Sequence, residues 1–341
     1  MIRFLKQWIW LALLLQACGT NASLPTGQPD SLPTPTLTPS QTPAPATEIP
    51  ISTIPSTPLP NIARVLIVSF DGLRPDAIQA AEMSNVISLI ENGAYTLTAQ
   101  TIFPSLTLPS HSSMLVGTCP AKHIVRWNEY VPENGFALGT DIFDLAQNAN
   151  LRTVFVVGKE KLRQVTEPTS TDFFGFVDAT DKVRDSISLE SMAIEQIRLG
   201  FDLMFMHFPD GDLAGHEYGW MSRQQLTAYR KDDESLGLLI EVMKSRNLFD
   251  DTLIIVTADH GGHDTTHGSA LPEDLTIPWL VSGARILRGE LVTQVYTMDT
   301  AATVAFALGL PIPSEWDGIP VYEAFGLPVD PLRDGGCKGT P

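Results

Sequence analysis

Cysteine is scarce in this chain of 341 residues, which has only Cys18, Cys119 and Cys337. Apart from Cys18, which lies close to the N-terminus, only Cys119 and Cys337 remain. These two could form one disulfide. Such a bond would suit a protein exported to an oxidising compartment. A chance pair of unconnected cysteines is the alternative, and the sequence leaves the choice open.

Basic residues are also few, with 22 Lys and Arg against 39 Asp and Glu and a formal net charge of −17. This balance argues against a basic, nucleic-acid-binding face. An anionic substrate would also be repelled at long range, unless the site contains positive charge that the sequence does not encode. Bound divalent cations would supply that charge.

The apolar run at the N-terminus is too short to span a bilayer as a mature helix. It follows a basic start, extends from Trp8 to Leu15 and is typical of an export signal. The letters LQAC, which end at Cys18, resemble the bacterial lipobox. We therefore expect a lipoprotein signal peptide at 1–18, lipidation of Cys18 and a domain anchored outside the cytoplasm to the cell membrane. An ordinary secretory signal, giving a secreted protein, is the alternative.

Residues 19–60 almost lack charge, with only Asp30 and Glu48, and contain eleven prolines. Proline removes backbone donors and favours extended conformations, so this stretch is predicted to be a disordered Pro/Thr-rich linker. We expect a catalytic domain at 61–328 and a C-terminal tail at 329–341.

The domain alternates apolar runs with helical stretches. Strands buried on both faces are predicted at 64–70, 152–157, 202–208, 252–258 and 276–282. Helices are predicted at 76–92, 186–199, 223–246 and 299–308. This alternation predicts an α/β fold, a mostly parallel central sheet with helices on both faces.

Acidic and imidazole side chains gather at the carboxyl ends of these strands, where such folds bind ligands. They are Asp71 after the first strand, Asp212 and His216 after the third, Asp259 and His260 after the fourth, and His267 on the next loop. Each alone could be a helix cap or a solvated loop residue. Their joint occurrence favours a metal centre, and mixed Asp and His ligands suit zinc.

Two ions can be assigned from the spacing. Asp212 and His216 are four residues apart, so both can reach one ion, and His267 can complete that set. The groups from the first and fourth strands remain for a second ion with one open position. Two such ions would clamp the attacking and leaving sides of a phosphoryl displacement.

A hydroxyl could fill the open position. The segment 101–128 begins with a turn and continues into a helix-like stretch from Ser110 to Val116, whose N-terminus favours an anion. Zinc coordination would lower the pKa of a hydroxyl there and make it a nucleophile. Thr107 and Ser105 are the candidates by chemistry, and both could equally be turn formers.

Together these stretches resemble the alkaline phosphatase superfamily, in its type I phosphodiesterase/nucleotide pyrophosphatase branch. The resemblance covers residues 62–325, through the ordered motifs FDGLRPD, TLPSHSSMLVGTCPAKHIVRWN, PDGDLAGHEYG, TADHGG, HGSALPEDLTIPWLVSG and YTMDTAATVAFALGLPIPSEWDG. It implies an alkaline phosphatase-like domain that binds two Zn²⁺, or other divalent cations, and hydrolyses a small phosphate ester.

The resemblance also implies the roles of individual residues. Thr107 would attack the phosphorus and form a threonyl-phosphate intermediate, which water then hydrolyses. The first ion would be bound by Asp212, His216 and His267, and the second by Asp71, Thr107, Asp259 and His260. Asp210 competes with Asp212, but the family's Asp-x-x-Gly-His spacing selects Asp212.

The chain departs from the family pattern beside the nucleophile. Nucleotide pyrophosphatases usually have Thr-Phe-Pro-Asn, whereas this chain has Thr-Leu-Pro-Ser, with Ser110 as a shorter and weaker donor. Serine there also resembles the sulfatase nucleophile segment. A sulfatase needs Cys or Ser at position 107 for conversion to formylglycine, so sulfatase activity is demoted to a possible side reaction.

Four residues are candidates for substrate binding: Ser110, Asn128, Lys159 and His263. Lys159 follows the second predicted strand and could contact phosphoryl oxygens, as a similar Gly-Lys does in sulfatases; a solvated surface charge is the alternative. A solvent-facing side chain is the alternative for His263.

Two classes of function remain open, an enzyme and a metal-stabilised surface binding protein. All the positions expected to bind metal, and that of the nucleophile, carry suitable residues. This favours the enzyme, because inactive relatives that keep the fold usually lose a ligand or the nucleophile. A phosphodiesterase or nucleotide pyrophosphatase is the preferred reading, and a phosphomonoesterase of the same superfamily is the alternative.

Overall fold

The computed structural model describes residues 62–178, 186–329 and 336–337. The predicted signal peptide, the linker and Cys18 lie outside the described residues, as does most of the predicted tail. Within the described ranges, no helix combines the length and the apolar composition needed to cross a bilayer.

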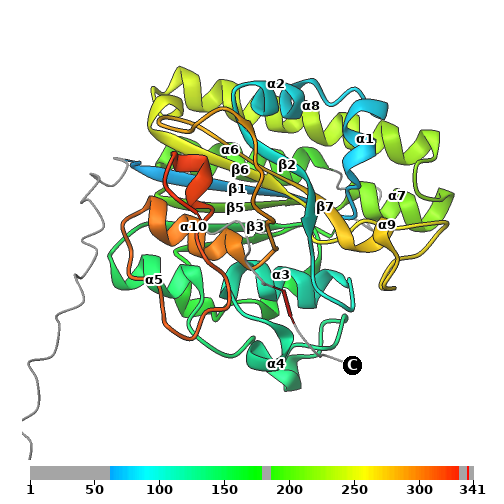
Figure 1. The fold of residues 1–341 in the computed structure, drawn as a ribbon, viewed down its shortest axis with the longest axis horizontal. Helices are drawn as coiled ribbons and strands as arrows, with labels where there is room; N and C mark the ends of the chain where they lie inside the picture. The colour runs from blue at the N-terminus through cyan, green and yellow to red at the C-terminus, as the bar shows by residue number, and fades with distance from the viewer. Residues whose placement is uncertain (1–61, 179–185, 330–335, 338–341) are drawn as a thin grey trace, which may run out of the picture. The chain divides into compact units, whose positions relative to one another are not determined.

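An eight-stranded sheet forms the centre of the domain (Figure 1). Its strands are β1 (Arg64–Phe70), β2 (Gly93–Gln100), β3 (Thr153–Val157), β4 (Phe173–Phe176), β5 (Leu203–Phe208), β6 (Thr252–Thr257), β7 (Thr276–Ser282) and β8 (Gly289–Glu290). The order is β4-β3-β5-β1-β6-β7-β2-β8, and of these strands β7 runs antiparallel to both of its neighbours. The predicted α/β fold with a mostly parallel sheet is confirmed.

Helices cover both faces of the sheet (Figure 1). One layer contains α1 (Pro75–Ala80), α2 (Ser84–Glu91), α6 (Ser186–Leu199) and α8 (Arg223–Ser245), and the other contains α3 (Thr107–Val116), α5 (Ile142–Asn148) and α10 (Asp299–Ala307). The remaining helices are α4 (Pro120–His123), α7 (Asp210–Tyr218), which packs on α8, and α9 (Pro272–Leu275). Single 3₁₀ turns lie at Pro132–Asn134, Glu160–Gln164, Pro168–Ser170, Phe249–Asp251 and Tyr322–Phe325.

The five predicted strands are all present, within one residue of the predicted bounds. The single helix predicted at 76–92 is wrong, because the chain forms two helices there. Glu82 lies between them with a φ of 56°, a left-handed conformation that no helix continues through. The predicted helices at 186–199, 223–246 and 299–308 are confirmed to within one residue, whereas β2, β4 and β8 were not predicted.

The central strands are packed tightly enough to fix the positions of their ends. Every residue of β3, β5 and β6 is buried. The ring of Phe155 on β3 lies 5.2 Å, centroid to centroid, from both Phe143 and Phe205. Close aromatic packing of this kind leaves little freedom for the strands to shift.

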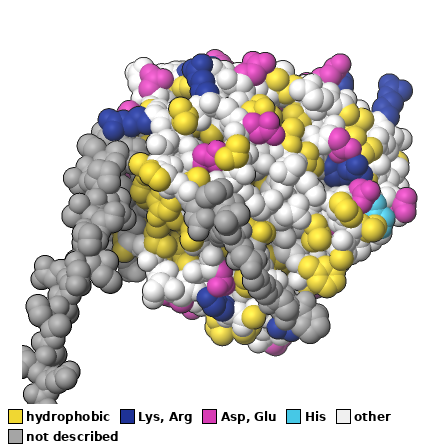
Figure 2. All heavy atoms as spheres, in the orientation of Figure 1, with side chains coloured by type: hydrophobic (Ala, Val, Ile, Leu, Met, Phe, Trp, Pro, Cys, Tyr) yellow, Lys and Arg dark blue, Asp and Glu magenta, His cyan; other side chains and the backbone are white. Residues whose placement is uncertain are grey.

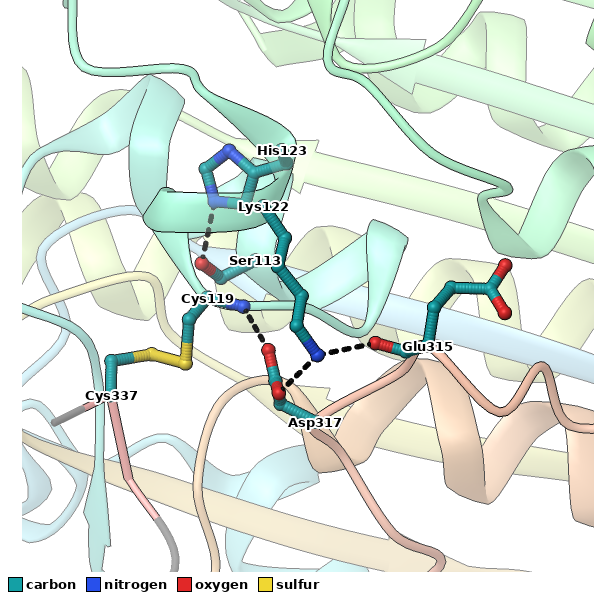
Figure 3. Close-up of a disulfide and its surroundings, with 7 residues drawn as sticks. All are labelled: Ser113, Cys119, Lys122, His123, Glu315, Asp317 and Cys337. Carbon is teal, nitrogen blue, oxygen red and sulfur yellow. Dashed lines mark hydrogen bonds and ion pairs between the residues drawn. A yellow bond between two sulfur atoms is a disulfide. The ribbon is translucent and has the colours of Figure 1, made fainter. Parts of the chain in front are cut away.

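The two cysteines whose pairing the sequence left open form a disulfide (Figure 3). Cys119 lies between α3 and α4, and Cys337 belongs to the C-terminal segment. The backbone N–H of Cys119 donates to Oδ2 of Asp317 at 2.8 Å, and Nζ of Lys122 donates to Oδ1 at 2.6 Å. These contacts fasten two C-terminal segments to the turn that follows α3.

On the face drawn in Figure 2, acidic and basic side chains are interspersed, and apolar side chains lie between them. Exposed large apolar residues lie on separate elements, for example Leu199 on α6, Leu238 on α8 and Val292 after β8. Scattered exposures of this kind are normal for a globular domain.

Candidate metal centre and active site

Four adjacent strands of the same direction bring reactive side chains to one edge of the sheet. The strands β3, β5, β1 and β6 are neighbours and parallel, so their carboxyl ends lie together. Lys159 follows β3, Asp212 lies in the first turn of α7 after β5, Asp71 follows β1 and Asp259 follows β6. The structure places these four side chains in one cluster.

Gly72 lets the chain turn sharply after Asp71. Its φ is 72°, in the left-handed region that favours glycine, and a Cβ there would lie 3.2 Å from the Trp220 ring and 3.3 Å from Cβ of Asp212. The N–H of Gly72 donates to Oδ1 of Asp259 at 3.1 Å. The glycine therefore allows the three acidic residues to approach one another.

Each of the three carboxylates has one oxygen held by the protein and one oxygen without a donor. Oδ2 of Asp71 accepts a hydrogen bond from Nε2 of His207 at 2.8 Å, Oδ2 of Asp212 accepts one from Nζ of Lys159 at 2.6 Å, and Asp259 is held as described above. The remaining oxygens are buried and accept no hydrogen bond within the described residues: Asp71 Oδ1, Asp212 Oδ1 and Asp259 Oδ2. Buried polar atoms rarely lack a partner, so these three oxygens fit a cation.

Three imidazoles present their Nε2 atoms to the same place. In His260, His267 and His216 the Nδ1 atom lies 2.8, 2.8 and 3.0 Å from the carbonyl oxygens of Gly261, Ser105 and Thr265, respectively. A carbonyl oxygen only accepts, so in the neutral ring Nδ1 carries the proton and Nε2 offers a lone pair. This is the arrangement in which backbone carbonyls orient metal-binding histidines.

The ligand atoms form two overlapping groups whose members all lie within 4.8 Å of one another. One group is Asp212, His260 and His267, and the other is Asp71, Asp259 and His260. Nε2 of His216 is 3.4 Å from Oδ1 of Asp212, so this more exposed side chain can join the first group. The sequence assigned His260 to the second ion, whereas the structure places it between the two groups.

Burial and neighbouring charges set the protonation of the cluster. Burial, together with the charge of Asp71, raises the pKa of Asp259 well above its ordinary value. Burial would also raise the pKa of Asp71, but Lys159 and His207 hold it well below its ordinary value. Burial lowers the pKa of His260 to about 3, so this imidazole is neutral at pH 7 and free to act as a ligand.

Thr107 lies at the edge of this cluster as the first residue of α3. Its Oγ1 atom is buried, 3.4 Å from Nε2 of His260 and 3.4 Å from Nζ of Lys159. The other candidate nucleophile, Ser105, donates its hydroxyl to the carbonyl oxygen of Ser269 at 3.1 Å. Of the two hydroxyls, only that of Thr107 contacts the cluster.

Of the predicted substrate-binding residues, Asn128 lies beside the start of α3 and Ser110 lies within it. Oδ1 of Asn128 accepts a hydrogen bond from the N–H of Leu108 at 2.9 Å, next to Thr107. The hydroxyl of Ser110 is buried and lies 3.2 Å from Oγ1 of Thr101. The side chain of Asn128 is thus anchored at the helix terminus, whereas Ser110 is buried within α3 and contacts Thr101.

His263 lies outside the two groups of ligand atoms. Its Nδ1 atom is 2.7 Å from Oδ1 of Asp274, and this hydrogen bond raises the pKa of His263. Oδ2 of Asp274 accepts a hydrogen bond from the N–H of Ser269 at 2.8 Å. The contacts of Asp274 with His263 and Ser269 stabilise the loop that carries His267.

Sequence reasoning missed two buried histidines that position the site. His207, on β5, holds Asp71, and burial lowers its pKa. His111, on α3, places Nδ1 2.8 Å from the carbonyl oxygen of Thr107 and Nε2 2.9 Å from the hydroxyl of Ser69 on β1. The one available signal was an imidazole in an otherwise apolar strand, MFMHF, close to the strand end.

Comparison with known proteins finds related sequences. A sequence model of the family described as type I phosphodiesterase / nucleotide pyrophosphatase matches residues 65–277. An uncharacterised pyrophosphatase/phosphodiesterase of Schizosaccharomyces pombe is 28% identical over 58% of this chain and 44% of its own. The catalytic subunit of human GPI ethanolamine phosphate transferase 2 is 26% identical over 78% of this chain and 28% of its own. This chain therefore spans less than half the length of either relative.

Solved structures show the same fold. The inactive threonine-to-alanine variant of murine ectonucleotide pyrophosphatase/phosphodiesterase 5, in complex with AMP, superposes with a TM-score of 0.60. It is 15% identical, over 76% of this chain and 98% of its own. The alkaline phosphatase-like fold implied by the sequence motifs is confirmed.

Proposed function

Because the chain belongs to the type I phosphodiesterase/nucleotide pyrophosphatase family, we propose that it is an extracytoplasmic, zinc-dependent hydrolase of phosphodiesters or nucleotide pyrophosphates. One observation carries this proposal. Three buried carboxylate oxygens without hydrogen-bond donors face three imidazole nitrogens whose lone pairs are free. That donor set suits divalent cations, and the family supplies the reaction that such cations support.

The residues present fit two divalent cations. The first would be held by Asp212, His216 and His267, and the second by Asp71, Asp259, His260 and the hydroxyl of Thr107. Mixed nitrogen and oxygen donors suit zinc, although other divalent ions can use the same atoms. When bound, such ions supply positive charge that polarises phosphoryl oxygens and favours deprotonation of a nearby hydroxyl.

Thr107 is the proposed nucleophile. Its position at the N-terminus of α3 favours negative charge on Oγ1, because the helix dipole is positive there. Attack forms the Oγ1–P bond and breaks the bond from phosphorus to the leaving oxygen, which departs and takes up a proton. Water then hydrolyses the threonyl-phosphate intermediate, which still carries the substrate's second ester group; this step releases a phosphomonoester and restores the hydroxyl. The murine protein is inactive when one of its threonines is replaced by alanine, so it depends on a threonine, as we propose for this chain.

The substrate class is proposed from the same comparisons. The murine protein binds AMP, and the fungal relative is named a pyrophosphatase/phosphodiesterase, so small phosphate esters with a nucleotide part are the first choice. A phosphomonoesterase is the second candidate, favoured by one observation. The ammonium of Lys159 lies 3.4 Å from the nucleophile, where it could offset the extra charge of a monoester.

The location of the domain is also a proposal. An export signal with lipidation of Cys18 would place the domain outside the cytoplasm, on a Pro/Thr-rich linker from the membrane. The disulfide between Cys119 and Cys337 supports export, because such bonds persist mainly in oxidising compartments.

Turnover of chromogenic esters by the zinc-loaded protein tests the reaction. We expect bis(p-nitrophenyl) phosphate to be cleaved faster than p-nitrophenyl phosphate, and p-nitrophenyl sulfate slowest. A chelator should abolish turnover and added Zn²⁺ should restore it. Thr107→Ala should lower kcat by roughly 10³-fold or more, whereas Ser105→Ala should keep most of it. Turnover that persists in chelator, or in Thr107→Ala, would contradict the proposal.

A further inference from the structure

Lys159 lies inside the metal centre although it cannot be a ligand while it carries a proton. It follows Gly158 at the end of β3, and its side chain is only 12% exposed. Its Nζ atom lies 2.6 Å from Oδ2 of Asp212, 2.7 Å from Oδ2 of Asp71 and 3.4 Å from Oγ1 of Thr107. It donates hydrogen bonds to Asp212 and Thr107 and forms an ion pair with Asp71.

The oxygens that Lys159 contacts are not the ones that face the imidazoles. On both Asp71 and Asp212 the lysine takes Oδ2, whereas the buried oxygen without a hydrogen bond is Oδ1. Oδ1 of Asp71 is 3.5 Å from Nε2 of His260, and Oδ1 of Asp212 is 3.6 Å from Nε2 of His267. The lysine and a pair of cations can therefore use opposite oxygens of the same two carboxylates.

The two carboxylates belong to different groups of ligand atoms. Asp71 lies in the group with Asp259, and Asp212 lies in the group with His267. Lys159 is thus a bridge between the two halves of the centre. It reaches that position from β3, and Asp212 and Asp71 follow the next two strands in the sheet order, β5 and β1.

We propose that Lys159 is a fixed positive charge of the centre, which joins its two halves both before and after metal ions bind. This inference rests on the proposed function, because it takes the two groups of ligand atoms to be metal sites. In it Lys159 is a positioning residue: it orients Oδ1 of Asp71 and of Asp212 and donates to the hydroxyl of Thr107. A substrate-binding lysine that leaves the carboxylates when ions bind is the competing role.

A specific dependence of stability on metal follows. Without ions, Lys159 is the ammonium that offsets the buried carboxylates of Asp71 and Asp212, and removal of one partner from a buried ion pair is strongly destabilising. With two divalent cations bound, the same carboxylates have other positive partners. The loss caused by removing the lysine should then be smaller, because part of the compensation comes from the ions.

Thermal unfolding of Lys159→Met, in excess chelator and in saturating Zn²⁺, tests this inference. In chelator we expect the Tm to fall by about 10 °C relative to the natural protein. In Zn²⁺ we expect a fall of less than half that size, but above zero, because the lysine stays on the Oδ2 atoms. Lys161→Met, two residues further along the same turn, is the matched control and should change neither Tm by more than about 2 °C.

Three results would overturn the inference: no fall in chelator, an equal fall in both conditions, or a Zn²⁺-loaded Tm identical to that of the natural protein. If Lys159→Met does not fold without metal, Lys159→Arg decides, since it keeps the charge. A folded Arg variant in chelator supports the inference, and one as unstable as Lys159→Met overturns it. Melting needs no substrate, so an inactive natural protein would remove the proposed reaction and leave this result intact.

Discussion

Nε2 of His207 lies 2.8 Å from Oδ2 of Asp71, so a histidine inside β5 holds the carboxylate that follows the neighbouring strand β1. The N–H of Gly158 donates to Nδ1 of the same ring at 3.2 Å, which fixes the proton on Nε2. Asp71 is therefore oriented by a ring nitrogen that can only donate a hydrogen bond. Loss of such supporting contacts typically weakens metal binding 10- to 100-fold.

His207→Phe should accordingly weaken Zn²⁺ binding by about 10- to 100-fold, because Asp71 loses its neutral donor. Competition with a chromogenic chelator measures the affinity directly. His123→Asn is a suitable control, since His123 is also buried but lies beyond the far end of α3, and its affinity should stay within about twofold. An unchanged affinity in His207→Phe would show that Asp71 keeps its orientation without the histidine.

Asn128→Ala should lower kcat more than Ser110→Ala. Asn128 satisfies the N–H of Leu108 at the start of α3, so its loss frees the turn that holds Thr107 and costs about 1 kcal/mol of stability. Ser110 lies within α3, and its buried hydroxyl contacts Thr101. Steady-state kinetics with a phosphodiester separates the two, and a larger kcat loss in Ser110→Ala would reverse the assignment.

The acid stability of the domain should depend on His123. Nδ1 of His123 accepts from the N–H of Val125 at 3.1 Å, and Nε2 lies 2.9 Å from the hydroxyl of Ser113 (Figure 3). Burial lowers the pKa of His123 to about 4. The unfolded chain therefore binds more protons than the folded protein between about pH 6.5 and pH 4, and stability is lost as the pH falls through this window.

We expect this histidine to account for about 3 kcal/mol of the stability lost between pH 7 and pH 4. Denaturant unfolding at several pH values measures the loss, and His123→Asn should flatten the curve by that amount. A variant whose pH dependence matches that of the natural protein would show that His123 is protonated without cost in the folded state.

The Cys119–Cys337 disulfide should contribute to stability and not to the reaction. The bond closes a loop with a sequence separation of 218 residues, and disulfides typically contribute about 2–4 kcal/mol. The double variant Cys119→Ser, Cys337→Ser should unfold at lower denaturant concentration and keep its kcat at 25 °C. Equal unfolding midpoints would contradict the stabilising role.

Much of the fold could be predicted because buried parallel strands have a strong sequence signal. The run at 64–70 and those after it are short, continuous and apolar, and they were found within one residue. The strand β2 was not predicted, because Leu97 and Thr98 within it are exposed and interrupt its apolar run. The break between α1 and α2 depends on one left-handed residue, Glu82, which no periodicity reveals.

The candidate site was predictable where chemistry coincides with strand ends. Asp71, Asp212 and Asp259 lie together because adjacent parallel strands end at one edge. The supporting contacts were not predictable, since a buried histidine such as His207 looks like a core residue in sequence. Nor could sequence tell which oxygen of each carboxylate Lys159 would take, because that depends on side-chain orientation across three strands.

Anomalous diffraction from crystals grown with Zn²⁺ tests the central claim most directly. We expect two zinc peaks about 4 Å apart. One should contact Oδ1 of Asp71 and Oδ2 of Asp259, and the other Oδ1 of Asp212 and Nε2 of His267, with Lys159 still on the two Oδ2 atoms. A protein saturated with Zn²⁺ that shows no peak between these carboxylates would contradict the account.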